Sequence, residues 1–215
     1  MKRFVILGLM TAIAVVVFAG CGAIQERVDA NVYERIHRQL INMESFVAQA
    51  TVTYISNNNS HTYETTQHAL STGQYRIEVI APINVAGNTT IFDGAMISQY
   101  NLRLDGRVMQ TTTEAPERVE ILLTSFIRNF IRTTESTVMA ANLDGALTTV
   151  LEATIEGNHP YLATQRLWVD NETLKPIRMV IFDAQGTERV IVEYSGFEFD
   201  VEIPPELFAL PENPQ

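Results

Sequence analysis

Residues 164–199 read TQRLWVDNETLKPIRMVIFDAQGTERVIVEYSGFEF, and this stretch decides the fold. Three runs rich in β-branched and aromatic residues cover 164–169, 176–182 and 188–199. Such runs predict β-strands, and the turn-forming residues between them predict tight connections. Because strands joined by short turns pair in antiparallel fashion, the stretch predicts a three-stranded meander.

The same alternation of strand and turn extends through most of the chain. Asp93-Gly94 is a strong hairpin signal, Asp105-Gly106 repeats it, and residues 157–160 are expected to end the strand before them. Roughly ten strands with local connections indicate an α+β fold with one large, curved antiparallel sheet. The further predicted strands cover 46–55, 62–70, 74–80, 88–92, 95–100, 137–141 and 147–155.

A first helix is predicted at the start of the domain. Asp29 can cap it, and Val32, Ile36 and Leu40 recur at the spacing of one helical face.

A second helix is predicted in the middle of the chain. Pro116 suits its first turn, and the acidic residues Glu114, Glu117 and Glu120 are expected to compensate the helix dipole rather than to form a catalytic pair. Its unbroken apolar stripe is expected to pack on the concave face of the sheet. The stripe consists of Val119, Leu122, Leu123, Phe126, Ile127, Phe130 and Ile131. The candidate lining of the core or of a groove is Val119, Leu122, Leu123, Phe126, Ile127 and Phe130 together with Trp168 from the sheet.

The N-terminal residues have the pattern of a bacterial lipoprotein signal peptide. Two basic residues precede the uncharged run 4–17, and residues 18–21 read Phe-Ala-Gly-Cys. The ending resembles a lipobox, although phenylalanine stands where leucine is usual. The alternatives are an uncleaved anchor, which at this length is short for a bilayer, and ordinary signal cleavage. We expect a covalent diacylglycerol on Cys21 to hold the protein at the extracytoplasmic face of a bacterial membrane.

The chain is acidic, and this limits what it binds. Its formal charge is −10, and loss of the two N-terminal basic residues would leave −12. Nucleic acid and anionic lipid surfaces repel such a chain, so no nucleic-acid partner is expected. Its single cysteine rules out an internal disulfide. The expected organisation is a signal peptide over 1–20, a lipidated tether over 21–30, one domain over 31–210 and a tail over 211–215.

No combination of residues predicts catalysis, a cofactor or a metal site. The four histidines, His37, His61, His68 and His159, lack metal-ligand spacing and are expected to be solvated. No Gly-rich phosphate loop or nucleophile elbow is present in the sequence. Methionines spread over the strands fit either ordinary core filling or an adaptable acyl-chain groove. The chain is therefore expected not to be an enzyme.

A family resemblance rests mainly on residues 165–210. The run LWVDNETLKP over 167–176 resembles the hairpin of LolA-type proteins, and 183–199 and 203–208 resemble the hairpin and closing segment after it. The resemblance implies an open half-barrel with helices on its concave side that binds acyl chains or protein partners. The lipid anchor departs from the soluble LolA carrier. A tethered chain of this kind is similar to the germination lipoprotein GerS of spore-forming clostridia, which partners a cell-wall amidase.

Two functions remain open at this point. The first is an anchored binding module for an envelope protein, with a peptidoglycan amidase as the implied partner. The second is a lipid or lipoprotein carrier with acyl chains in its groove, which needs a cavity of several hundred Å3. Exposed edge strands also predict a strand-swapped homodimer as one oligomeric state.

Overall fold

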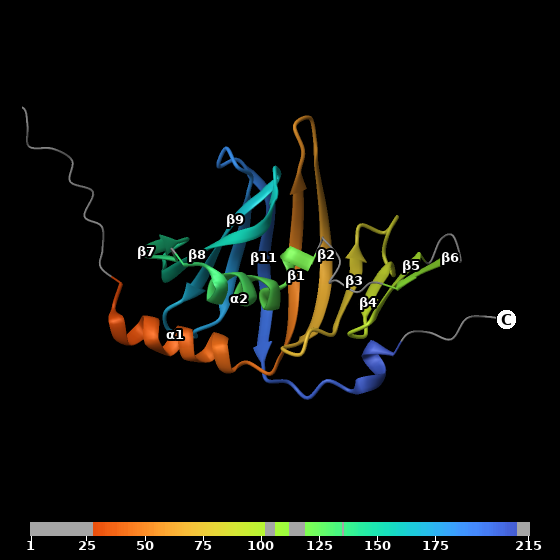
Figure 1. Ribbon diagram of the computed structural model, residues 1–215, viewed down its shortest axis with the longest axis horizontal. Helices are drawn as coiled ribbons and strands as arrows, with labels where there is room; N and C mark the ends of the chain where they lie inside the picture. Colours follow the sequence, from red (N-terminus) through yellow and green to blue (C-terminus); the bar gives the residue numbers. More distant parts are fainter. Residues whose placement is uncertain (1–27, 102–105, 112–118, 135, 210–215) are drawn as a thin grey trace, which may run out of the picture.

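The computed structural model describes residues 28–101, 106–111, 119–134 and 136–209. The signal peptide, Cys21, the start predicted for the second helix and the tail over 211–215 lie outside these residues. The described strands form one antiparallel sheet in the order β6-β5-β4-β3-β2-β1-β11-β10-β9-β8-β7 (Figure 1). The strands are β1 (Ser45–Ile55), β2 (Ser60–Leu70), β3 (Tyr75–Ala81), β4 (Thr89–Phe92), β5 (Met96–Asn101), β6 (Gly106–Thr111), β7 (Thr137–Leu143), β8 (Ala146–His159), β9 (Leu162–Asp170), β10 (Pro176–Phe182) and β11 (Glu188–Phe199).

The sheet consists of two meanders joined along their first and last strands. β1 through β6 form one meander and β7 through β11 form the other, each with neighbouring strands consecutive in sequence. β1 pairs with β11 from Phe46 opposite Phe199 to Tyr54 opposite Val190. This pairing places the first and the last strand in the sequence beside each other at the centre of the sheet. The stretch that decides the fold therefore forms β9, β10 and β11, as predicted.

Two features of the sheet differ from the sequence prediction. The described strands number eleven rather than roughly ten, because the chain after Asp105 forms β6. β8 also continues past Gly157 and ends at His159, whereas the sequence predicts that the strand ends before residues 157–160. Its register shifts between Thr154 and His159, and Gly157 has a φ of +109°. A glycine at positive φ lets a strand form a bulge and continue, so this glycine does not end the strand.

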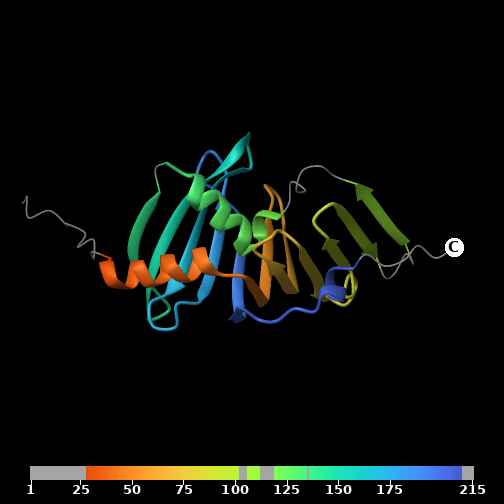
Figure 2. The same ribbon diagram turned by 60° about the horizontal axis from the view of Figure 1, so that its bottom comes forward.

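Both α-helices lie on the same side of the sheet, which we call the helix-bearing face (Figure 2). The helix α1 (Ala30–Asn42) begins at Asp29, whose Oδ1 accepts a hydrogen bond of 2.8 Å from the backbone N–H of Asn31. Ile36 and Leu40 are buried, as the stripe predicts. The α+β class, the open antiparallel sheet and the helices on one face are therefore confirmed.

The second predicted helix is interrupted at its beginning. A 3-10 turn, η2 (Val119–Ile121), precedes α2 (Leu123–Arg132), and Leu122 between them has extended backbone angles of −90° and 141°. Leu122 is 1% exposed. The extended residue lets both the turn and the helix bury apolar side chains against the sheet. The prediction of one unbroken helical stripe is thus wrong at its N-terminal end.

The buried face of α2 is also rotated from the predicted stripe. Ile131 is 59% exposed and Ile127 is only partly buried, whereas Ser125 and Asn129 are buried. The Asn129 side chain donates a 2.9 Å hydrogen bond to the Gln165 side chain in β9. Because this bond satisfies a buried amide, a polar residue occupies the face that contacts the sheet.

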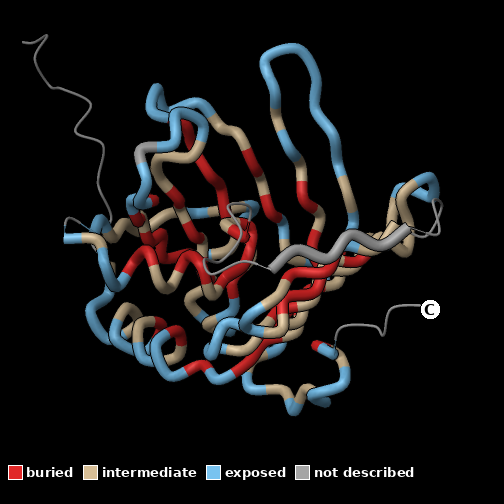
Figure 3. Tube along the Cα trace, turned by 45° about the vertical axis from the view of Figure 1, so that its right-hand side comes forward, coloured by how far each residue is buried: buried red, intermediate tan, exposed pale blue. Residues whose placement is uncertain are grey.

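The core lies between the helices and the sheet. Phe126 stacks on Phe130 in α2, and Phe46 of β1 stacks on Phe197 of β11 with centroids 5.2 Å apart. A further turn, η3 (Pro205–Phe208), buries Phe208 beyond the last strand. Figure 3 shows buried residues concentrated in the middle of the sheet and exposed residues at the tip of the β1–β2 hairpin. The ends of the strands beyond the helices are therefore accessible.

Candidate functional site

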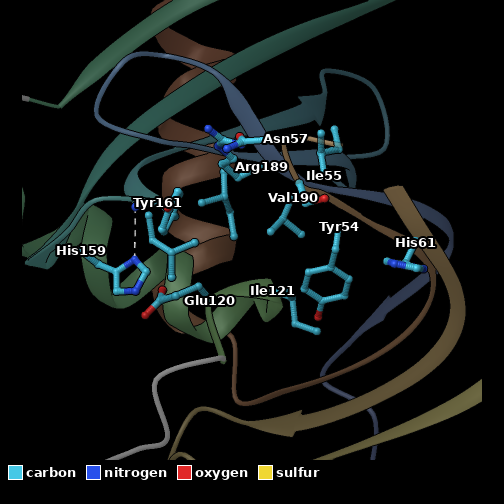
Figure 4. A pocket seen from close by; sticks show the side chains of 13 residues that line it. Tyr54, Ile55, Asn57, His61, Glu120, Ile121, His159, Tyr161, Arg189 and Val190 are labelled. Carbon is cyan, nitrogen blue, oxygen red and sulfur yellow. Dashed lines mark hydrogen bonds between the residues drawn. The ribbon is translucent and has the colours of Figure 1, made fainter. Parts of the chain in front are cut away.

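A pocket of about 470 Å3 opens on the helix-bearing face (Figure 4). Its walls come from the ends of three hairpins, β1–β2, β8–β9 and β10–β11, and from η2. A volume of this size is typical of a small-ligand site. The lining residues are Tyr54, Ile55, Ser56, Asn57, His61, Glu120, Ile121, His159, Tyr161, Leu162, Ile181, Arg189 and Val190.

Arg189 fixes the three hairpins relative to one another. Its Nε donates a 2.7 Å hydrogen bond to Oδ2 of Asp183, and its Nη2 lies 2.6 Å from the same oxygen. Its Nη1 donates to Oδ1 of Asn57 at 2.8 Å, and its guanidinium carbon lies 5.4 Å from the centroid of the Tyr161 ring. The guanidinium of Arg189 therefore links the three hairpins at the pocket mouth, and its charge is paired with Asp183.

Asp183 is the buried counterion of this arrangement. It is 3% exposed and also accepts backbone hydrogen bonds from Gln185 and Thr187. Burial by itself raises the pKa of the carboxyl, but the Thr187 N–H and the Arg189 side chain outweigh it, so the pKa of Asp183 is lowered. The pair is thus ionised at neutral pH.

Glu120 is the acidic residue in the pocket wall, and it comes from η2. Its Oε2 accepts a 3.0 Å hydrogen bond from Asn129, and its Oε1 lies 3.7 Å from Arg128. Gln165 donates a 2.8 Å hydrogen bond to the backbone oxygen of Glu120. Burial raises the pKa of Glu120, while Arg128 and Asn129 oppose that rise. Glu120 therefore lies in η2, before the start of α2, and not in the first turn of a continuous helix as predicted.

Two of the four histidines line this pocket, on opposite sides of it (Figure 4). His61 lies near the start of β2. His159 lies at the end of β8, where its Nδ1 accepts a 3.3 Å hydrogen bond from the backbone N–H of Tyr161. Both side chains are exposed at the rim, so they are solvated as expected. His37 instead contacts the rings of Tyr33 and Phe130.

A second, smaller cavity of about 250 Å3 continues along the same face over β1 to β5. It shares Tyr54 and Ile121 with the first pocket. The two cavities are therefore adjacent, and these two residues lie between them. The other walls of the smaller cavity are Val52, Tyr63, Thr65, Tyr75, Ile77, Val79, Thr90, Ile97, Gln99 and Val119.

The predicted lining residues divide into three groups. Leu122, Leu123, Phe126 and Phe130 are core residues and do not line either cavity. Val119 lines the smaller cavity, and Ile127 packs at the margin of the core.

Trp168 lies on the opposite face of the sheet. It alternates in β9 with Leu167 and Val169, which are in the core, and Arg178 lies 5.8 Å from its ring. The prediction that Trp168 lines the core or a groove is therefore wrong.

The sequence analysis missed the polar residues of the pocket because they come from four separate turns. Asn57, Tyr161 and Arg189 have no common spacing, and only the sheet register brings their hairpins together. One usable signal was the amide of Asn129 within the apolar stripe, since a buried polar residue needs a polar partner.

No group of three or more His, Cys, Asp or Glu side chains among the residues that the structure describes could hold a metal ion. Within the same ranges, no helix combines the length and apolar character needed to cross a bilayer. The pocket can bind a ligand through apolar contacts, hydroxyl groups, amides and one carboxylate.

Comparisons with solved structures find the same architecture elsewhere. An uncharacterized conserved protein from Thermus thermophilus has a TM-score of 0.53 at 13% identity, covering 85% of this chain and 94% of that one. One chain in the structure of the CwlD amidase from Clostridioides difficile in complex with the GerS lipoprotein has a TM-score of 0.47 at 26% identity, covering 83% of this chain and 98% of that one. A LolA superfamily protein from Nitrosomonas europaea has a TM-score of 0.45 at 12% identity, covering 84% of this chain and 96% of that one. The first of these similarities shows a shared fold.

Comparisons by sequence give one family and no individual relative. No curated protein matches the chain. The family described as sporulation protein YdcC-like matches residues 1–208 of the 215. The chain therefore belongs to the sporulation protein YdcC-like family.

Proposed function

We propose that this protein is a lipid-anchored, non-catalytic module of the envelope of sporulating bacteria that holds a protein partner on its helix-bearing face. The observation that carries the proposal is the pocket between the hairpin ends, which α1 and α2 leave open. Family membership supports a role in sporulation. The first partner to test is a peptidoglycan amidase, which the sequence resemblance implies.

The anchor and the partner can be tested together in sporulating host cells. Wild-type protein and Cys21→Ser are compared by membrane fractionation and by chemical cross-linking. Wild-type protein is expected in the membrane fraction with a specific protein adduct, while Cys21→Ser leaves the membrane because two acyl chains are lost. An unchanged distribution of Cys21→Ser would refute the anchor. Absence of any protein adduct from the wild type would refute the partner role.

The alternative function is a carrier of acyl chains. It is favoured by the two adjacent cavities, which share Tyr54 and Ile121 and have largely apolar walls. Native mass spectrometry of residues 22–215 distinguishes the two functions. Bound phospholipid or fatty acid that solvent removes would support the carrier, and a ligand-free mass would support the partner module.

A further inference from the structure

We propose that the pocket of Figure 4 selects a partner segment in which an apolar side chain lies next to a basic one, and that it disfavours anionic amphiphiles. This inference rests on the proposed function and names the chemistry of the partner. It is carried by the pairing of charges in the pocket wall and by the apolar floor.

The floor of the pocket suits one or two aliphatic or aromatic side chains. Ile121, Leu162, Ile181 and Val190 come from η2, β9, β10 and β11 and present apolar surface to the cavity. Ile181 and Val190 are 1% and 5% exposed, so the floor is part of the packed sheet. Burial of an apolar anchor here gains free energy without moving the scaffold.

The charges at the wall do not favour an anion. Arg189 is the one arginine or lysine among the lining residues that the structure describes. Its guanidinium bonds Asp183 through Nε and Nη2 and Asn57 through Nη1, and it is only 15% exposed. A phosphate or carboxylate would have to break this buried pair, which is costly.

Glu120, in contrast, favours a cationic group in the pocket. Its side chain is 15% exposed, and its Oε1 is 3.7 Å from Arg128, too far for a hydrogen bond. Because the Arg128 side chain is 39% exposed, water screens this contact and the carboxylate can accept from an entering cation. The formal charge of −10 attracts basic partners at longer range and repels anionic lipids.

The test uses the full chain in lipid nanodiscs with labelled isoleucine methyl groups. The probes are Ac-Leu-Arg-NH2, Ac-Leu-Glu-NH2 and Ac-Gly-Arg-NH2, and the methyl signals of Ile121 and Ile181 report binding. We expect Ac-Leu-Arg-NH2 to bind about tenfold more tightly than either other peptide, equivalent to about 1.4 kcal/mol. In Glu120→Gln the preference for arginine over glutamate should fall to near one.

Glu156→Gln is the matched control. Glu156 is 65% exposed, pairs with Arg132 and does not line the pocket, so the preference should persist in this variant. Equal or tighter binding of Ac-Leu-Glu-NH2, equal loss of preference in both variants, or no binding of any peptide would overturn the inference. The comparison of peptides on the wild type does not depend on the folding of a variant. A specific protein adduct in cells together with any of these results would leave the proposed function standing while this inference fails.

Discussion

Phe126 shows what a single residue contributes at the contact between helix and sheet. It is 0% exposed and stacks on Phe130 with centroids 5.8 Å apart. Phe126→Ala should lower the free energy of unfolding by about 3–5 kcal/mol, because it leaves a cavity in a close-packed core. Urea denaturation measures this loss. Ile131→Ala, at a 59% exposed position of the same helix, should change stability by less than about 1 kcal/mol. Equal losses would contradict the burial described for α2.

Asp183 determines a pH dependence of stability at the same scale. Its pKa is lowered in the folded state, so its contribution is present above the unfolded pKa of about 3.9 and is lost as pH falls through the folded value. Asp183→Asn should therefore be less stable than the wild type at pH 7, with a difference that shrinks in acid. Chemical denaturation of both proteins at pH 7 and at an acidic pH measures this difference in stability. A difference independent of pH would show that the charge of Asp183 does not stabilise the fold.

At the scale of elements, a buried polar cluster holds η2 and α2 on the sheet. Asn129 donates to both Glu120 and Gln165, which belong to η2 and β9. Asn129→Ala would leave buried acceptors without a donor and should cost about 1–3 kcal/mol. Hydrogen exchange should show faster exchange of α2 amides, while β1 and β11 keep their protection. Uniform acceleration over all elements would mean that the cluster does not act locally.

Sequence periodicity predicted most elements because period and turn chemistry are local properties. The alternation in 188–199 gave β11, and Asp29 marked the start of α1. The break at Leu122 was not predictable, because its extended backbone is stabilised only by contacts that η2 and α2 make with the sheet. Trp168 was misplaced for a related reason. Strand alternation says which residues share a face, but the position of the helices decides which face is the core.

At the scale of the whole molecule, pairing of β1 with β11 joins two locally connected meanders. This pairing brings Asn57 within 2.8 Å of Arg189, although 132 residues separate them. The pocket could not be read from the sequence, since its walls depend on this long-range register. The helix-bearing face is accessible at the hairpin ends, where the proposed protein partner would meet it.

The central claim is that this pocket receives a protein rather than a lipid. A photoreactive p-benzoylphenylalanine at Tyr161, which is 53% exposed at the rim, tests it in the full-length protein in sporulating host cells. The same group at Ile83, 85% exposed and outside the described pockets, is the control. The account predicts a protein adduct from position 161 alone, mapped by mass spectrometry to a segment in which an apolar residue lies next to a basic one. A lipid adduct at position 161, or the same adducts from both positions, would contradict it.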